Sequence, residues 1–129
     1  MIILDTHAWI WWVNESEQLP KATRLLIERS NRIGIPAICC WELAMLVAKG
    51  RIGLSMDVAV WLDLALQRPG VELLPLTPDI AVLSTRLPGN FHGDPADRLI
   101  VASSLSRNAP LVTKDEKITH WGFIPVYWE

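Results

Sequence analysis

Residues 1–5, "MIILD", join a short β-branched apolar run to a carboxylate. The run predicts a buried strand, and Asp5 stands where that strand would end. Residues 20–31, "PKATRLLIERSN", then predict a helix, with Pro20 near its start and apolar side chains at helical spacing. A strand followed by a helix is therefore the first structural unit.

The same alternation continues along the chain. Residues 32–37, "RIGIPA", predict a second buried strand, and residues 38–50 predict a helix that ends at Gly50. Further helices are expected over 56–68, over 78–87 and from Asp94 onward, and further strands over 71–76, 109–115 and 122–128. Pro125 limits the last strand to an edge. Such alternation predicts an α/β fold, with helices on both faces of a mostly parallel sheet of four to five strands.

Length and composition suit one domain over residues 1–129. No apolar run approaches the roughly 18 residues of a membrane span, and "MIILD" lacks a basic leader, so a cytoplasmic protein without a membrane segment is expected. Cys39 and Cys40 are adjacent, which disfavours an ordinary disulfide. Three scattered histidines join no zinc-binding motif.

A formal net charge of −2 argues against indiscriminate electrostatic binding of nucleic acid. The sequence also contains no glycine-rich phosphate loop and no nucleophile-elbow serine. The chemistry must therefore be sought among the carboxylates.

Four carboxylates occupy positions that could converge at one edge of the sheet, those of Asp5, Glu42, Asp97 and Asp115. Asp5 and Asp115 each follow a predicted strand, and ligands of open α/β sheets bind beyond the carboxyl ends of the strands. Glu42 lies in the apolar context "AICCWELAML", where it either faces solvent or needs a cation or partner.

The stretch "HGDPADRLIVA", residues 92–102, contains two aspartates with two readings. Asp94 is a good N-cap before Pro95, and Asp97 in the first turn favours the helix dipole. Alternatively, Asp97 joins Asp5, Glu42 and Asp115 at a site for hard cations such as Mg²⁺ or Mn²⁺, which suits phosphate chemistry.

Four segments, "ILDTHAWIWW", "PAICCWELAMLVAKGRI", "HGDPADRLIVASS" and "PLVTKDEKI", together resemble a PIN-domain ribonuclease, most closely a VapC-type toxin of a bacterial toxin-antitoxin pair. The resemblance covers nearly the whole chain, in order. It implies a PIN-like three-layer α/β/α sandwich.

The resemblance also implies roles for residues. Asp5, Glu42, Asp97 and Asp115 match the acids that would hold one or two Mg²⁺ or Mn²⁺ ions and thereby catalyse in-line attack of metal-activated water on an RNA phosphodiester. Thr6 and Thr113 match polar positions beside them, Asp94 is a minor candidate for a metal contact, and Arg98 is a basic neighbour of Asp97 whose alternative role is a salt bridge. Cys39 and Leu46 replace a serine and a lysine common in similar chains.

Seven tryptophans are more than a core of this size obviously needs, so some are expected to be exposed or covered by a partner. The resemblance implies a homodimer and a VapB-like antitoxin, and a tryptophan that stacks on bases is a further hypothesis. Two other functions stay open: a catalytically idle PIN-like module that binds RNA or protein, and a small-molecule phosphatase.

Overall fold

The protein is built on one five-stranded sheet in which all neighbouring strands are parallel. The computed structural model describes all 129 residues. In the order β3-β2-β1-β4-β5, the sheet contains β1 (Ile2–Leu4), β2 (Ile33–Pro36), β3 (Val71–Leu74), β4 (Leu111–Val112) and β5 (Val126–Tyr127). The predicted parallel sheet of four to five strands is confirmed, and β5 lies at an edge as Pro125 indicated.

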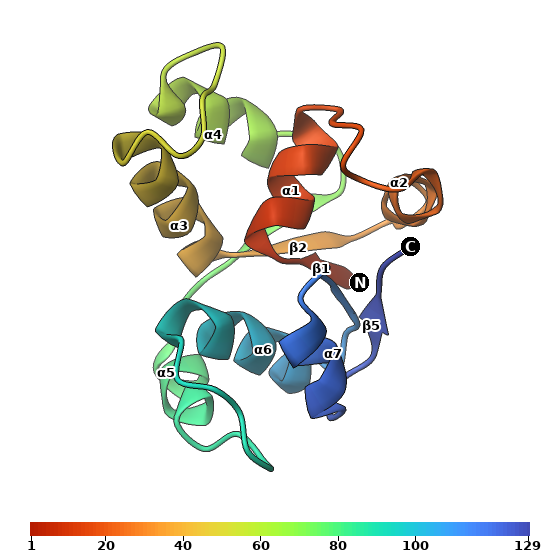
Figure 1. Cartoon of the computed structure of the whole chain (residues 1–129), viewed down its shortest axis with the longest axis vertical. Coiled ribbons are helices and arrows are strands. Elements are labelled where there is room, and N and C mark those ends of the chain that lie inside the picture. The colour runs from red at the N-terminus through yellow and green to blue at the C-terminus, as the bar shows by residue number, and fades with distance from the viewer.

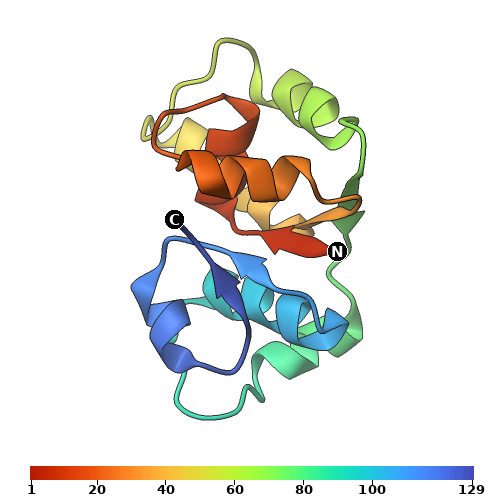
Figure 2. The ribbon, with the colours of Figure 1, turned by 90° about the vertical axis from the view of Figure 1, so that its right-hand side faces the viewer.

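Helices cover both faces of this sheet. They are α1 (Thr6–Val13), α2 (Lys21–Glu28), α3 (Ala37–Ala48), α4 (Val58–Leu66), α5 (Pro78–Ser84), α6 (Pro95–Arg107) and α7 (Glu116–Trp121). Figure 1 shows α1 to α4 on one side of the sheet and α5 to α7 on the other, and Figure 2 shows the same layers after a quarter turn. The three-layer α/β/α sandwich is therefore confirmed. None of these helices has the length and apolar character that crossing a bilayer requires.

The prediction is wrong around Asp115. The strand expected over 109–115 pairs only over Leu111–Val112, and Asp115 instead begins α7, a helix that the sequence analysis did not predict. The Asp115 carboxylate accepts the backbone N–H of Lys117 at 2.8 Å, and Glu116 adds an acid to the first turn. Both features stabilise a helix start, so the chain leaves the sheet at Thr113.

The core takes three of the seven tryptophans. Trp9, Trp12 and Trp61 are buried, and the rings of Trp9 and Trp61 meet edge to face with centroids 5.2 Å apart. Trp41 lies at the surface with 57% of its area exposed. Close packing also reaches the strands, because a Cβ on Gly34 of β2 would lie 2.8 Å from Leu74 Cδ1.

The strand order places a change of direction beside β1. The chain runs from β1 through β2 to β3 on one side, and then crosses to β4 and β5 on the other. Ligands of parallel α/β sheets bind where the order reverses, at the carboxyl ends of the strands. In this protein that point is the end of β1 and β4, where Asp5 and Thr113 lie.

Candidate active site

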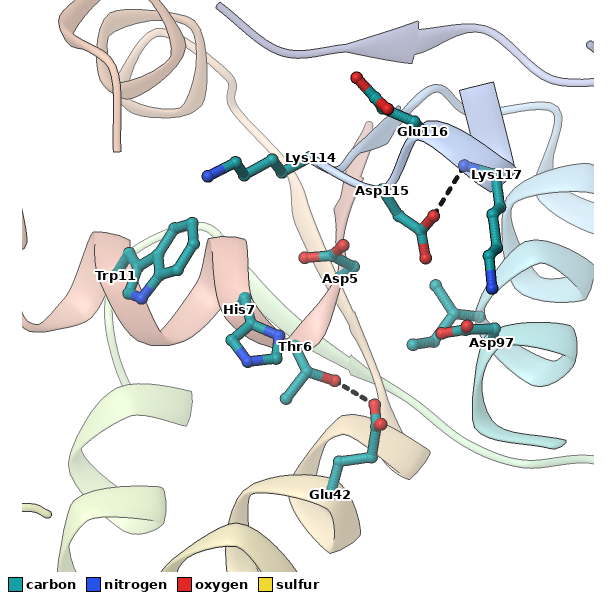
Figure 3. Close-up of a pocket in the computed structure, with 11 residues that line it drawn as sticks. Asp5, Thr6, His7, Trp11, Glu42, Asp97, Lys114, Asp115, Glu116 and Lys117 are labelled. Carbon is teal, nitrogen blue, oxygen red and sulfur yellow. Dashed lines mark hydrogen bonds between the residues drawn. The ribbon is translucent and has the colours of Figure 1, made fainter. Parts of the chain in front are cut away.

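The four predicted acids line one cavity at the carboxyl ends of β1 and β4. The cavity has a volume of about 740 Å³. Figure 3 shows its side chains projecting from several elements that are far apart in the sequence. Its lining residues are Asp5, Thr6, His7, Trp11, Glu42, Asp97, Ile100, Lys114, Asp115, Glu116 and Lys117. The structure therefore brings Asp5, Glu42, Asp97 and Asp115 together.

Asp5 both begins a helix and lines the cavity. It directly follows β1, and its Oδ1 accepts the backbone N–H of Ala8 at 2.9 Å, which caps α1. Its Oδ2 accepts a hydrogen bond from the Thr113 hydroxyl. Burial raises the pKa of Asp5, and these two hydrogen bonds oppose the shift. Both carboxylate oxygens are thus held by donors.

Glu42 points into the cavity (Figure 3), so it does not simply face bulk solvent, which was one of the two positions expected for it. It projects from α3, and its Oε1 accepts a hydrogen bond from the hydroxyl of Thr6. Burial raises the pKa of Glu42, the Thr6 bond opposes this, and the charge of Asp94 adds to it. Thr6 therefore connects the start of α1 to the acid of α3.

Asp94 and Asp97 have different positions. Asp94 is exposed and caps α6, because its Oδ1 accepts the backbone N–H of Asp97 at 3.1 Å. It does not line the cavity. The Asp97 carboxylate faces the cavity and accepts no hydrogen bond with good geometry. Burial, followed by the charges of Asp94 and Asp115, raises the pKa of Asp97 to about 7.

Asp115 lies beside Asp97, on the side of the cavity away from Trp11 (Figure 3), and ligand oxygens of the two acids come within 4.8 Å of each other. It caps α7 through the Lys117 N–H, and its own backbone N–H donates to Thr113 Oγ1 at 3.1 Å. Thr113 is fully buried and links two of the acids. Its hydroxyl donates to the Asp5 carboxylate, and its oxygen accepts the backbone N–H of Asp115.

His92 is a neighbour of the site that the sequence analysis did not single out. Its Nε2 lies 3.3 Å from Asp97 Oδ2, and these groups and Asp115 offer ligand atoms within 4.8 Å of one another. The His92 Nδ1 accepts the backbone N–H of Asp94 at 3.3 Å, which places the proton of a neutral ring on Nε2. A histidine that binds metal usually donates from its other nitrogen. The geometry therefore favours His92 as a donor toward Asp97 over His92 as a ligand.

Arg98 faces away from the cavity. Its guanidinium donates to the backbone oxygens of Ser84, Phe91 and His92 at 2.8–3.0 Å, and it lies over the Phe91 ring at 5.9 Å. The structure shows no salt bridge from Arg98 to a carboxylate, the alternative considered for it. Arg98 fastens the loop before α6 and does not line the cavity.

Cys39 occupies a fully buried position behind the site. Its Sγ lies 3.9 Å from the backbone oxygen of Leu4, and burial raises the pKa of the Cys39 thiol well above its ordinary value. The thiol is therefore protonated and packs as a small apolar side chain.

The charge balance of the cavity fits a cation. Five acids line it, since Glu116 joins the four described, against Lys114 and Lys117. Carboxylate oxygens are the donors that hard divalent cations prefer, and Asp97 is an uncompensated acceptor aimed into the space. The residues present therefore suit a divalent metal ion, which would relieve the repulsion among them.

Comparison with known proteins identifies relatives of the whole chain. Residues 2–124 match the family model "PIN domain". The chain is 37% identical over 117 residues to "Ribonuclease VapC22" of Mycobacterium tuberculosis, an alignment that covers 91% of this chain and 88% of the relative.

Solved structures share the fold. VapBC2 from Rickettsia felis, bound to a DNA fragment from its promoter, superposes with a TM-score of 0.73 at 23% identity and full coverage of both chains. DNA-bound VapBC from Salmonella typhimurium gives a TM-score of 0.72 at 18% identity, with 98% of each chain covered. FitAcB from Neisseria gonorrhoeae gives 0.70 at 19% identity, with 98% of this chain and 96% of that chain covered.

Proposed function

The chain belongs to the PIN-domain family, and from that membership we propose that it is an endoribonuclease that acts as the toxin of a VapBC-like toxin-antitoxin pair. The observation that carries the proposal is the convergence of Asp5, Glu42, Asp97 and Asp115 on one cavity at the reversal of strand order. The likeness to a ribonuclease over most of both chains supports the same activity.

Asp5, Glu42, Asp97 and Asp115 would hold one or two divalent cations, Mg²⁺ or Mn²⁺. When bound, such a cation supplies Lewis-acid polarisation of the phosphate and lowers the pKa of a coordinated water. Hydrolysis of an RNA phosphodiester by in-line attack would leave 5′-phosphate and 3′-hydroxyl ends.

The residues around the acids then have separate tasks. The hydroxyls of Thr113 and Thr6 orient the carboxylates of Asp5 and Glu42 through the hydrogen bonds described. The His92 Nε2–H, which lies 3.3 Å from Asp97 Oδ2 without forming a hydrogen bond, would contribute only weakly to the orientation of Asp97. Lys114 and Lys117, which line the same cavity, attract the phosphates of the substrate.

The proposed partners are RNA, a second copy of the chain and a VapB-like antitoxin. VapBC complexes among the structural neighbours support the antitoxin. An antitoxin segment that covers the acidic cavity would prevent RNA from entering it. We propose that the protein acts in the cytoplasm, where it would meet both RNA and its antitoxin.

The direct test is cleavage of RNA by the purified protein with Mg²⁺ or Mn²⁺, compared with the same protein in a chelator and with Asp97→Asn. We expect cleavage only in the first sample, and growth arrest on expression that a co-expressed antitoxin relieves. RNA binding without cleavage would instead indicate a catalytically idle module. Hydrolysis of a phosphomonoester but not of RNA would indicate a phosphatase.

A further inference from the structure

One wall of the acidic cavity is aromatic. Trp11 and His7 lie four residues apart on α1, so both side chains project from the same face of the helix, and both line the cavity. Their ring centroids are 5.6 Å apart. Figure 3 shows Trp11 and His7 beside Asp5, on the side of the cavity away from Asp97.

Trp11 is held in place without being enclosed. Its ring packs against Trp128 at 5.9 Å, and the Lys114 ammonium lies 5.8 Å from the ring centroid. Trp11 is only partly buried, whereas Trp9 and Trp12 on the same helix are buried in the core. Core packing therefore accounts for those two tryptophans but leaves the cavity side of Trp11 unexplained.

The lysine beside this ring has no carboxylate partner. Arg32 with Glu72 is the only ion pair that an arginine or lysine makes with a carboxylate in the structure. Lys114 is exposed, so its ammonium is available to a phosphate while it lies near the Trp11 ring. An aromatic platform beside free positive charge is the arrangement by which proteins bind single-stranded nucleic acid.

We propose that Trp11, His7 and Lys114 form a nucleotide subsite that accepts one unpaired base of the RNA strand next to the phosphodiester held at the acids. The base stacks on the Trp11 side of the cavity, and Lys114 binds an adjacent phosphate. Trp11 lies six residues beyond Asp5, about 9 Å along the axis of α1. The inference rests on the proposed function and requires that the stacked base be unpaired, because a paired base cannot reach a stacking platform.

The test measures binding separately from cleavage. In the Asp97→Asn background, fluorescence anisotropy would compare Trp11→Leu with unmodified Trp11 on two labelled strands of equal length, a mixed-sequence RNA without self-complementarity and an abasic ribose-phosphate strand. Leucine keeps apolar contact with Trp128 but removes the flat ring. We expect Trp11→Leu to weaken binding of the RNA about 5- to 100-fold and to leave binding of the abasic strand within about twofold.

Trp41→Leu is the matched control, because Trp41 is 57% exposed but does not line the cavity, and it should leave both affinities unchanged. An equal loss on both strands, or no greater loss from Trp11→Leu than from Trp41→Leu, would overturn the subsite. Trp11→Phe keeps a smaller ring, so its affinity for the RNA should lie between that of unmodified Trp11 and that of Trp11→Leu. If Trp11→Leu folds poorly, the comparison of Trp11→Phe with unmodified Trp11 on the two strands still tests the subsite. A base-dependent effect of Trp11 in a protein that never cleaves RNA would refute the proposed ribonuclease but not the subsite.

Discussion

The two sides of the cavity hold their carboxylates in different ways. On one side, Asp5 and Glu42 each accept a hydrogen bond from a threonine hydroxyl, and we refer to these two acids as the threonine-held pair. On the other side, Asp97 and Asp115 stand in the first turn of α6 and at the start of α7, and we refer to them as the helix-start pair. No hydroxyl group donates to either carboxylate of the helix-start pair.

The two pairs therefore differ in how firmly their carboxylates are oriented and in how far their negative charge is compensated. Burial raises the pKa of both threonine-held acids, but their hydrogen bonds oppose it and fix the carboxylate planes. Asp97 has no such compensation, and burial, followed by the charges of the surrounding acids, raises its pKa to about 7. The threonine-held pair is thus preorganised, while Asp97 is the acid that gains most from a cation.

The largest expected effect is on cleavage, where the two pairs should behave alike. Asp5→Asn and Asp97→Asn should each lower the rate of RNA cleavage more than about 100-fold, because losing a ligand costs more than losing a residue that orients one. Glu17→Gln, at an exposed acid outside the cavity, should leave the rate unchanged.

The same two variants should differ in thermal stability. In chelator at about pH 8, Asp97→Asn should raise Tm by a few degrees, because it removes an uncompensated charge. Asp5→Asn should give a lower Tm than Asp97→Asn, because Asp5 is already stabilised by two donors. Equal Tm values would remove the distinction between the pairs.

The threonines themselves should have the next largest effect. Thr113→Val and Thr6→Val should weaken Mn²⁺ binding about 10- to 100-fold, measured by calorimetry, because each removes the threonine hydroxyl that orients a carboxylate. Serine at either position should restore most of the affinity. Thr85→Val, which removes an exposed hydroxyl bonded to the Val82 backbone oxygen, is the control that should not change it.

A smaller effect is expected at His92, the histidine beside Asp97. His92→Ala should weaken Mn²⁺ binding by about tenfold or less, since His92 contacts the carboxylate from 3.3 Å without ideal alignment. His120→Ala, at an exposed histidine, is the matched comparison. A loss as large as that from Asp97→Asn would indicate that His92 itself binds the metal ion.

The smallest effect is the pH dependence of the metal-free protein. The pKa of Asp97 lies at about 7 in the folded chain, against an ordinary value of 3.8. Between these values the folded state keeps a proton that the unfolded state has released, so stability falls as pH rises through that range. Thermal unfolding in chelator should show this decline, and Asp97→Asn should reduce it. A decline of the same size in the variant would contradict the assignment to Asp97.

The sequence was sufficient for the parallel sheet, apart from the end of β4, and for the expectation that Asp5, Glu42, Asp97 and Asp115 lie together, because strand ends and an acid within an apolar stretch are local signals. It did not predict, however, that two of these acids cap helices. Asp5 and Asp115 cap helices and line the cavity at once, since a cap needs only one carboxylate oxygen. The contacts of His92 and Arg98 could not be predicted, because they depend on the path of the loop before α6. The position of Trp11 in the cavity wall could not be predicted either, because the sequence "AWIWW" does not indicate which of its three tryptophans lies outside the core.

The hydrogen bonds of Arg98 have a consequence for changing the protein by design. This guanidinium hydrogen-bonds to the loop before α6 only through the main-chain oxygens of Phe91 and His92, so these bonds do not depend on which side chains the loop carries. Asn90 is exposed, and a Cβ on Gly93 would meet no atom within 4 Å. Residues 90 and 93 are therefore positions at which a combinatorial library could vary the rim near His92 while Arg98 keeps the backbone in place.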